Sequence, residues 1–187
     1  MDRSTDRVRD ELLAVRCQSG EPDAFRELIA QFERPLRYYL QKLLGNDDRA
    51  YDVLQDVWLH AVRKIRGLVE PAALRVWLYR LAHGLAVDSI RRRQVRQSAE
   101  QDRAVSEDAA GADPEFTQID AIAIHRALDE LEPRQREALV LFFLEEMSLE
   151  DIADVVGCPI GTVKSRLHYA KRALHDLLKR DGYGLQR

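Results

Sequence analysis

Residues 148–178 read SLEDIADVVGCPIGTVKSRLHYAKRALHDLL, a pattern that predicts two helices joined by a tight turn. Ser148 can cap the first helix, and Gly157 can end it because glycine readily adopts a positive φ. Cys158 and Pro159 then lead into the second helix, since proline suits the first positions of a helix. One apolar stripe at helical spacing runs along this second helix: Val163, Leu167, Ala170, Leu174 and Leu177.

The opposite face of the second helix is rich in hydrogen-bond donors and positive charge. Its candidate DNA-binding residues are Thr162, Lys164, Ser165, Arg166, His168, Tyr169 and Arg172. A helix, a glycine-containing turn and a second helix place that second helix in the major groove of DNA. Long basic side chains there reach guanine edges or phosphates. A merely solvated basic face is the alternative, but the ordered run Gly-Thr-Val-Lys-Ser-Arg-Leu at residues 161–167 favours DNA binding.

Helical spacing of apolar residues also predicts helices at the start of the chain. Val8, Leu12 and Val15 mark a first helix, which we expect to stop at Gly20. In the second helix, we expect Pro35 to produce a kink or an end, because proline lacks a backbone N–H and clashes with the preceding turn. No alternating pattern typical of strands occurs anywhere in the chain.

Two further helices complete the first half of the chain. One follows Gly45, with Asp47 or Asp48 as the expected N-cap. Its apolar stripe is long: Ala50, Val53, Leu54, Val57, Trp58, Ala61, Val62 and Ile65. After a break at residues 67–71, a long helix is expected over residues 72–93.

Residues 97–120 lose the helical pattern and carry seven acidic side chains against one basic side chain. Such a stretch buries too little apolar surface to offset the entropy of ordering, which predicts a flexible acidic linker. The pattern resumes at Ile122, and Pro133 opens another helix. We therefore expect an all-α protein with two small helical domains, residues 1–96 and 121–187, joined by the linker.

The composition argues against an enzyme. The formal net charge is −3, but residues 157–187 carry seven basic and two acidic side chains, and such patches bind DNA. The five histidines lack metal-ligand spacing, and no nucleophile–base pair or phosphate loop appears. We expect no catalytic residue, metal or cofactor.

Cys17 and Cys158 lack a Cys-x-x-Cys spacing, and no signal peptide or membrane span appears, which indicates a cytoplasmic protein.

Residues 137–178 resemble region 4 of sigma factors of the extracytoplasmic-function (ECF) group, with residues 161–167 as the most telling run. Residues 25–93 resemble region 2 of the same family. The matching motifs are Ala50-x-Asp52-Val53-x-Gln55-Asp56-Val57-Trp58-Leu59, Trp77-Leu78-Tyr79-Arg80-Leu81-Ala82 and Asp88-x-x-Arg91-Arg92. The resemblance covers most of the chain outside the linker. It implies a transcription initiation factor that binds core RNA polymerase and recognises and melts promoter DNA.

The resemblance also implies roles for particular residues of region 2. The residues that would dock on the β′ clamp helices of the polymerase are Asp52, Gln55, Asp56 and Trp58. Simple solvation is the alternative for Gln55 and Asp56, and core packing is the alternative for Trp58. Contacts to the downstream promoter element fall to Arg75, Trp77, Arg80, His83, Arg91 and Arg92. Trp77 and Tyr79 offer rings for base stacking, with core packing as the alternative for Trp77. Residues 66–73 match the loop that captures an extruded base.

The resemblance also implies that residues 121–187 bind the upstream promoter element and that the protein contacts the β flap of the polymerase. An anti-sigma factor is a further implied partner, and the free protein is expected to be a monomer. The chain departs from the family pattern at Tyr51, at His83 and Gly84, and at Tyr169, which leaves its promoter preference open. Two alternatives remain: a helix-turn-helix regulator that acts without polymerase, and a decoy that titrates an anti-sigma factor. Stable polymerase binding separates the first alternative from a sigma factor.

We predict that a protease cuts the free protein fastest within residues 97–120, because an unfolded segment enters a protease active site without prior unfolding. Limited proteolysis followed by mass spectrometry measures the sites. Cleavage that begins elsewhere, with this segment resistant, would mean that the segment is folded against a domain.

Overall fold

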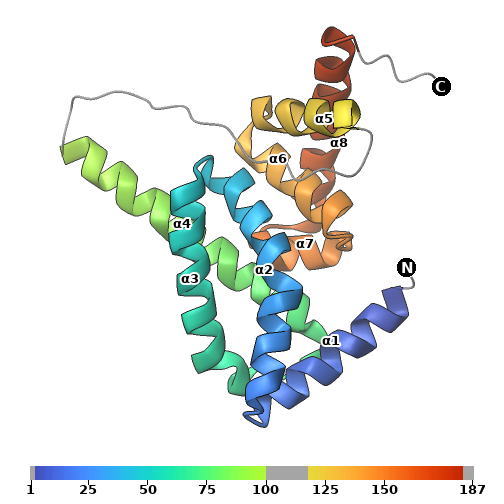
Figure 1. The fold of residues 1–187 in the computed structure, drawn as a ribbon. Helices are drawn as coiled ribbons and strands as arrows, with labels where there is room; N and C mark the ends of the chain where they lie inside the picture. Colours follow the sequence, from blue (N-terminus) through green and yellow to red (C-terminus); the bar gives the residue numbers. More distant parts are fainter. Residues whose placement is uncertain (1–2, 100–117, 183–187) are drawn as a thin grey trace. The chain divides into compact units, whose positions relative to one another are not determined.

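Helices form all the regular structure in the computed structural model, which describes residues 3–99 and 118–182. No strand occurs among these residues, so the predicted all-α class is confirmed. The chain divides into two compact units, one built on helices α1–α4 and the other on α5–α8 (Figure 1). Of the predicted linker, residues 97–99 complete α4 and residues 118–120 begin α5, while residues 100–117 lie outside the described part.

The first unit contains α1 (Arg3–Gln18), α2 (Pro22–Leu44), α3 (Asp47–Lys64) and α4 (Leu74–Ala99). Two short 3-10 turns, η1 (Ile65–Gly67) and η2 (Pro71–Ala73), connect α3 to α4. Helix α2 packs against both α3 and α4, and α1 packs against α2 and the two turns. The largest fully buried side chains of this unit are Leu13, Leu28, Phe32, Leu36, Tyr39, Leu40, Leu54, Ile65, Leu74, Leu78 and Tyr79.

Local capping explains the boundary between α2 and α3. Gly45 ends α2 with φ +63°, and its N–H donates to the carbonyl of Gln41 at 2.8 Å. The N-cap of α3 is Asn46, whose Oδ1 accepts the Arg49 N–H at 2.9 Å, so the prediction of Asp47 or Asp48 was wrong. Extended backbone at residue 46 starts the helix one residue earlier. The two aspartates therefore lie in the first turn, where they favour the positive end of the helix dipole.

Pro35 does not end α2, so of the two predicted outcomes, a kink or an end, the end is wrong. The helix runs without interruption from Pro22 to Leu44. Proline inside a helix costs about 3 kcal/mol or more. The buried side chains on either side, Phe32 and Leu36, belong to one continuous core face, and their burial offsets that cost. Helix α4 likewise extends beyond the predicted residue 93, to Ala99.

Helix α1 is held by a buried carboxylate rather than by the apolar residues that predicted it. Val8, Leu12 and Val15 are exposed, whereas Leu13, Ala14 and Cys17 are buried. On the same buried side, Asp10 accepts a hydrogen bond from Gln31 Nε2 at 2.6 Å and from Arg75 Nε at 3.2 Å. The Arg75 guanidinium also lies 5.1 Å from the centre of the Phe32 ring. This cluster joins α1 to α2 and α4.

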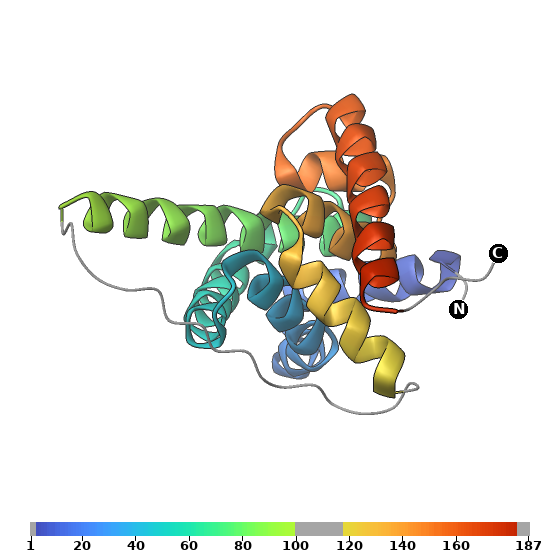
Figure 2. The same ribbon diagram turned by 90° about the horizontal axis from the view of Figure 1, so that it is seen from above.

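The second unit contains α5 (Gln118–Glu130), α6 (Pro133–Leu139), α7 (Leu149–Val156) and α8 (Ile160–Arg180), with a π-helical turn, η3 (Val140–Leu144), after α6. Helix α8 packs against α5 and α6 (Figure 2). Part of its core brings Ala123, Ala127 and Leu178 together with Leu174 and Leu177. As predicted, Pro133 stands at the start of a helix, with the Glu132 side chain accepting the Gln135 N–H as its cap.

Replacing Asp10 with alanine is expected to lower the free energy of unfolding of the first unit by about 2–4 kcal/mol, because Gln31 and Arg75 lose their shared acceptor in the core. Urea unfolding followed by tryptophan fluorescence measures this unit alone, since both tryptophans, Trp58 and Trp77, belong to it.

The control is Asp23→Ala. Asp23 pairs with Arg26, but these side chains are 75% and 77% exposed. Removing this pair should change the unfolding free energy by less than about 1 kcal/mol. Equal losses in the two variants would contradict a structural role for the buried carboxylate.

Candidate nucleic-acid interface

The turn between α7 and α8 has the geometry that the sequence predicted. Ser148 and Asp151 cap the start of α7 reciprocally: Ser148 Oγ accepts the Asp151 N–H at 3.0 Å, and Asp151 Oδ2 accepts the Ser148 N–H at 3.2 Å. Gly157 ends the helix with φ +65°, and the Cys158 N–H donates to the Ala153 carbonyl at 3.2 Å. The Pro159 carbonyl then accepts the N–H of Thr162 at 2.8 Å, which starts α8.

The predicted stripe of α8 faces the core. Val163, Leu167 and Ala170 are buried, and Leu174 and Leu177 are partly buried. The opposite side, which we call the α8 basic face, exposes Lys164, Ser165, His168, Tyr169 and Arg172, while Thr162 and Arg166 lie half-buried at its edge. No acidic side chain occurs between residues 160 and 172. The beginning of α8 therefore presents positive charge and donors on one side only.

Local contacts distinguish the members of this face. Ser165 Oγ donates to the Gly161 carbonyl at 3.0 Å, which leaves its oxygen available as an acceptor. The rings of His168 and Tyr169 meet edge to face at 5.4 Å, so they project as a pair. Lys171, outside the predicted set, lies 5.0 and 5.1 Å from the ring centres of Phe142 and Phe143. Its ammonium group thus lies over the half-buried Phe142 and the exposed Phe143.

Helix α4 separates the predicted downstream contacts into two groups. Arg80, Arg91 and Arg92 are exposed, and we call them the α4 arginine face. Arg80 and Arg91 are eleven residues apart, about three turns, and so lie on one side of the helix. Arg75 instead pairs with the buried Asp10, and His83 Nδ1 lies 3.3 Å from the Tyr39 hydroxyl.

The aromatic residues of α4 are not equivalent. Tyr79 is completely buried, and its ring packs edge to face against Tyr39 at 5.3 Å. The expectation that Tyr79 stacks on an unpaired base is therefore wrong, because the core already covers both faces of its ring. Trp77 is half-buried, which agrees with its assignment to the inner side of the helix while leaving part of its ring accessible.

The outward side of α3 carries polar residues beside an unexpected apolar patch. Asp52 and Gln55 are exposed, and Asp56 is half-buried. Sequence periodicity assigned Val62 to the core and did not single out Leu59, yet these two are 52% and 55% exposed. They line a shallow hollow of about 430 Å³ with Gln55, Trp58 and Arg63. We call Asp52, Gln55, Asp56, Leu59 and Val62 the α3 outer face.

Trp58 contributes to both sides of α3. It is half-buried, its ring lines the hollow, and its Nε1 is buried without a hydrogen-bond partner among the described residues. Core packing and surface contact, the two roles considered for this residue, are thus both compatible with its position.

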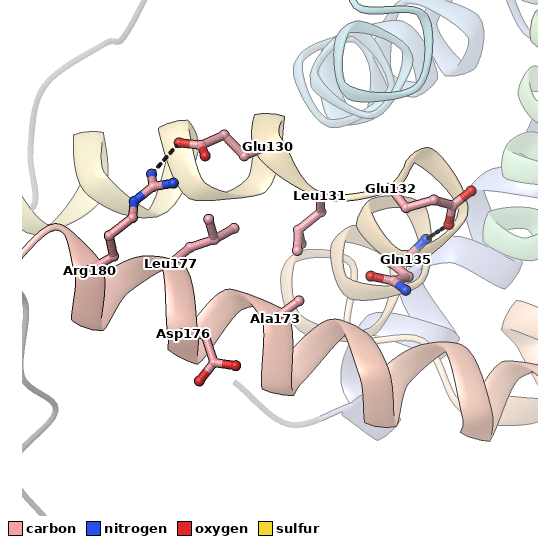
Figure 3. Close-up of a pocket in the computed structure, with 8 residues that line it drawn as sticks. All are labelled: Glu130, Leu131, Glu132, Gln135, Ala173, Asp176, Leu177 and Arg180. Atoms are coloured by element: carbon pink, nitrogen blue, oxygen red, sulfur yellow. Dashed lines mark hydrogen bonds and ion pairs between the residues drawn. The ribbon is translucent and has the colours of Figure 1, made fainter.

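A second hollow of about 430 Å³ lies between α5, α6 and α8 (Figure 3). Leu131, Ala173 and Leu177 form its apolar part, and the carboxylates of Glu130, Glu132 and Asp176 lie around it. Arg180 donates to Glu130 at 2.8 Å and to Asp181 at 3.0 Å, and these bonds raise the pKa of its guanidinium. The hollow therefore combines an apolar lining with a mainly negative rim.

Of the two cysteines, Cys17 is buried and Cys158 is half-buried, and both are free thiols. Burial raises the pKa of Cys17 to about 11, which keeps its thiol protonated at neutral pH and unreactive. Within residues 3–99 and 118–182, no group of three or more metal-ligating side chains comes together. In the same residues, every helix is too short or too polar to cross a membrane.

Comparison with known proteins gives a family for both units. A family model described as Sigma-70 region 2 matches residues 28–96, and one described as Sigma-70, region 4 matches residues 121–174. The ECF RNA polymerase sigma factor EcfG of Rhodopseudomonas palustris (strain TIE-1) is 32% identical over 160 residues, which cover 86% of this chain and 88% of the relative. SigW of Bacillus subtilis (strain 168) is 27% identical over 173 residues, 87% of this chain and 92% of the relative.

A solved structure is also similar. The sigma factor RpoE in complex with the anti-sigma factor NepR from Bartonella quintana has a TM-score of 0.74 and 30% identity, and the match covers 83% of this chain and 96% of that one. The two sigma regions thus occur in the order that the motifs predicted, each on a helical unit. The chain belongs to the ECF group of sigma-70 family RNA polymerase sigma factors and is a transcription initiation factor.

Proposed function

We propose that this sigma factor acts through three separate surfaces. The α8 basic face binds the upstream promoter element as duplex. The α4 arginine face and residues 66–73 contact the downstream element and hold it open. The α3 outer face docks on the β′ clamp helices of core RNA polymerase. In this proposal, residues 1–96 bind polymerase and the downstream promoter element, and residues 121–187 bind the upstream element. The protein would act in the cytoplasm, by binding alone, without a catalytic step of its own.

The single observation that carries the upstream assignment is the one-sided chemistry of α8. Its buried stripe fixes which side faces outward, and the capped turn after α7 fixes where the helix begins. The outward side then presents Lys164 and Arg172 among neutral donors with no carboxylate nearby. Side chains of these types bind phosphates and base edges in the major groove. The N-terminal end of a helix also carries partial positive charge, which favours a phosphate.

The downstream assignment is narrower than the sequence suggested. Arg80, Arg91 and Arg92 are exposed and able to contact a strand backbone. Arg75 is assigned to the structural cluster with Asp10, and His83 to a position beside Tyr39, from which each could affect DNA only indirectly. Trp77 remains the aromatic candidate for contact with an unstacked base, through the exposed part of its ring.

The docking assignment combines charge with apolar area. Asp52 and Asp56 supply negative charge, and Leu59 and Val62 supply exposed apolar surface beside it. An interface core of apolar side chains surrounded by charges is the arrangement that gives both affinity and orientation. For the second unit, we propose the hollow between α5, α6 and α8 as the docking site of the β flap. The likeness to a sigma factor solved with an anti-sigma factor supports an inhibitor of that kind as a further partner.

Replacing Lys164 and Arg166 together with alanine should weaken binding to an upstream duplex by about tenfold or more and flatten its salt dependence. Each lost phosphate contact removes about 0.9 from the slope of log affinity against log salt concentration. Fluorescence anisotropy at several salt concentrations, with a duplex selected from a random pool by the wild-type protein, measures both quantities.

The matched control is Arg126→Ala with Arg134→Ala, which removes the same charge from exposed positions on α5 and α6. Its salt slope should stay close to that of the wild type. If both double variants behave alike, or if Lys164 and Arg166 can be removed without loss, α8 is not the DNA-reading helix.

Replacing Gln55 and Asp56 together with alanine should reduce co-elution with core RNA polymerase on a sizing column, because the docking surface loses an amide and a carboxylate at its centre. The control is Glu33→Ala with Gln41→Ala, which removes the same two kinds of side chain from α2. Wild-type protein that fails to bind polymerase at low salt, with no inhibitor present, would refute the docking proposal. Equal binding by all three proteins would refute the assignment to α3.

A further inference from the structure

Helix α1 contacts both the connection between α3 and α4 and the first turn of α4 that follows it. This helix precedes the matched region 2 segment, which begins at residue 28. Its last residue, Gln18, meets the start of the connection, and Asp10 binds Arg75 in the first turn of α4. These two positions are eight residues apart, which is about 12 Å along a helix. Figure 1 shows the end of α1 beside the turns that join α3 to α4.

The contact at Gln18 is a double hydrogen bond to backbone. Gln18 Nε2 donates to the Ile65 carbonyl at 3.1 Å and to the Leu68 carbonyl at 2.7 Å, across 47 and 50 residues of chain. A side-chain amide carries two N–H groups, so one nitrogen satisfies both carbonyls. The Leu68 N–H also donates to the Ile65 carbonyl at 3.0 Å. The Gln18 amide therefore links α1 to the turn at residues 65–68 and holds Leu68 in position.

The residue directly after Leu68 has the most exposed large apolar side chain among the described residues of the unit. Val69 is 96% exposed, whereas Leu68 is half-buried and Ile65 is fully buried. Gly20 reinforces the same point, because a Cβ added there would lie 3.2 Å from the Arg66 guanidinium. Gln18 and Gly20, at and just after the end of α1, thus both lie beside residues 65–68. Val69, the next residue of the loop, is exposed to solvent.

We propose that α1 positions the promoter-reading loop and that Gln18 is its positioning residue, which determines how selectively residues 66–73 read the captured base of the downstream element. This inference rests on the proposed function of that loop. Base capture requires a pocket that stands ready within a fraction of an ångström. A loop that is ordered in advance loses less conformational entropy when the base enters, so the hydrogen bonds from Gln18 favour capture. A loop held in one conformation also discriminates better between the base that fits its pocket and the other bases.

The test compares holoenzymes of core RNA polymerase with wild-type protein, with Gln18→Glu or with Gln18→Met. The carboxylate has the same shape but only accepts hydrogen bonds, and the thioether is apolar, so each variant removes the hydrogen bonds from residue 18 to both carbonyls. The control, Arg16→Ala, removes the ion pairs of Arg16 with Glu21 and Glu27 near the same end of α1 and leaves Gln18 in place. The measured quantity is the rate of open-complex formation on a selected promoter and on all of its single-base variants in the downstream element.

We expect both Gln18 variants to reduce the preference for the captured base by about five- to tenfold, as the loss of a hydrogen-bonded fastening implies. Preferences at the other positions, polymerase co-elution and upstream duplex binding should stay at wild-type values, and Arg16→Ala should keep the full preference. A purely structural role for Gln18 would instead lower the rate on every promoter by the same factor.

The outcomes separate the inference from the function on which it rests. If the wild-type holoenzyme discriminates and both Gln18 variants discriminate equally well, the positioning role is wrong and the loop assignment stands. A uniform loss at all positions, shared by Arg16→Ala, also overturns it. If the wild-type holoenzyme opens no promoter, the proposed function itself fails, and the inference fails with it.

Discussion

Burial of one apolar stripe on each helix decides which side chains this sigma factor offers to its partners. A helix advances 100° per residue, so a stripe that faces the core fixes the direction of every other side chain. On α8, burial of Val163, Leu167 and Ala170 turns Lys164 and Arg172 outward. On α3, burial of Val53, Leu54 and Val57 leaves Gln55 outside. Binding chemistry in this protein is therefore a consequence of core packing.

The same constraint separates charge between helices. The net charge of −3 hides local differences in surface charge. Helix α3 exposes carboxylates, whereas the beginning of α8 exposes only basic and neutral residues. Under the proposed function, the positive charge of the α8 basic face complements the phosphates of DNA. The exposed Leu59 and Val62 add the apolar area that a charged surface alone would lack.

Helix α1 shows how a polar cluster adds what apolar packing cannot specify. Leu13, Ala14 and Cys17 bury apolar surface, but such contacts tolerate small shifts along the helix. Hydrogen bonds depend on direction as well as distance. Helix α1 makes such bonds at Asp10, with Gln31 and Arg75, and at Gln18, with two carbonyls. Hydrogen bonds of this kind set the register of α1 on the unit. The connection between α3 and α4 takes its position from that register.

The sequence by itself determined the helices, most of their ends, the helix-turn-helix and the family, because these depend on local spacing. Gly157, Ser148 and the α8 stripe each act within one or two turns, and their patterns are visible in the chain. Only the tertiary structure decided that Pro35 stays inside a helix, that Tyr79 is sealed in the core, and that Val62 is exposed. It also paired Asp10 with Arg75 across 65 residues. Periodicity indicates that a helix has an apolar side, but whether a particular side chain is covered depends on neighbours that are distant in sequence.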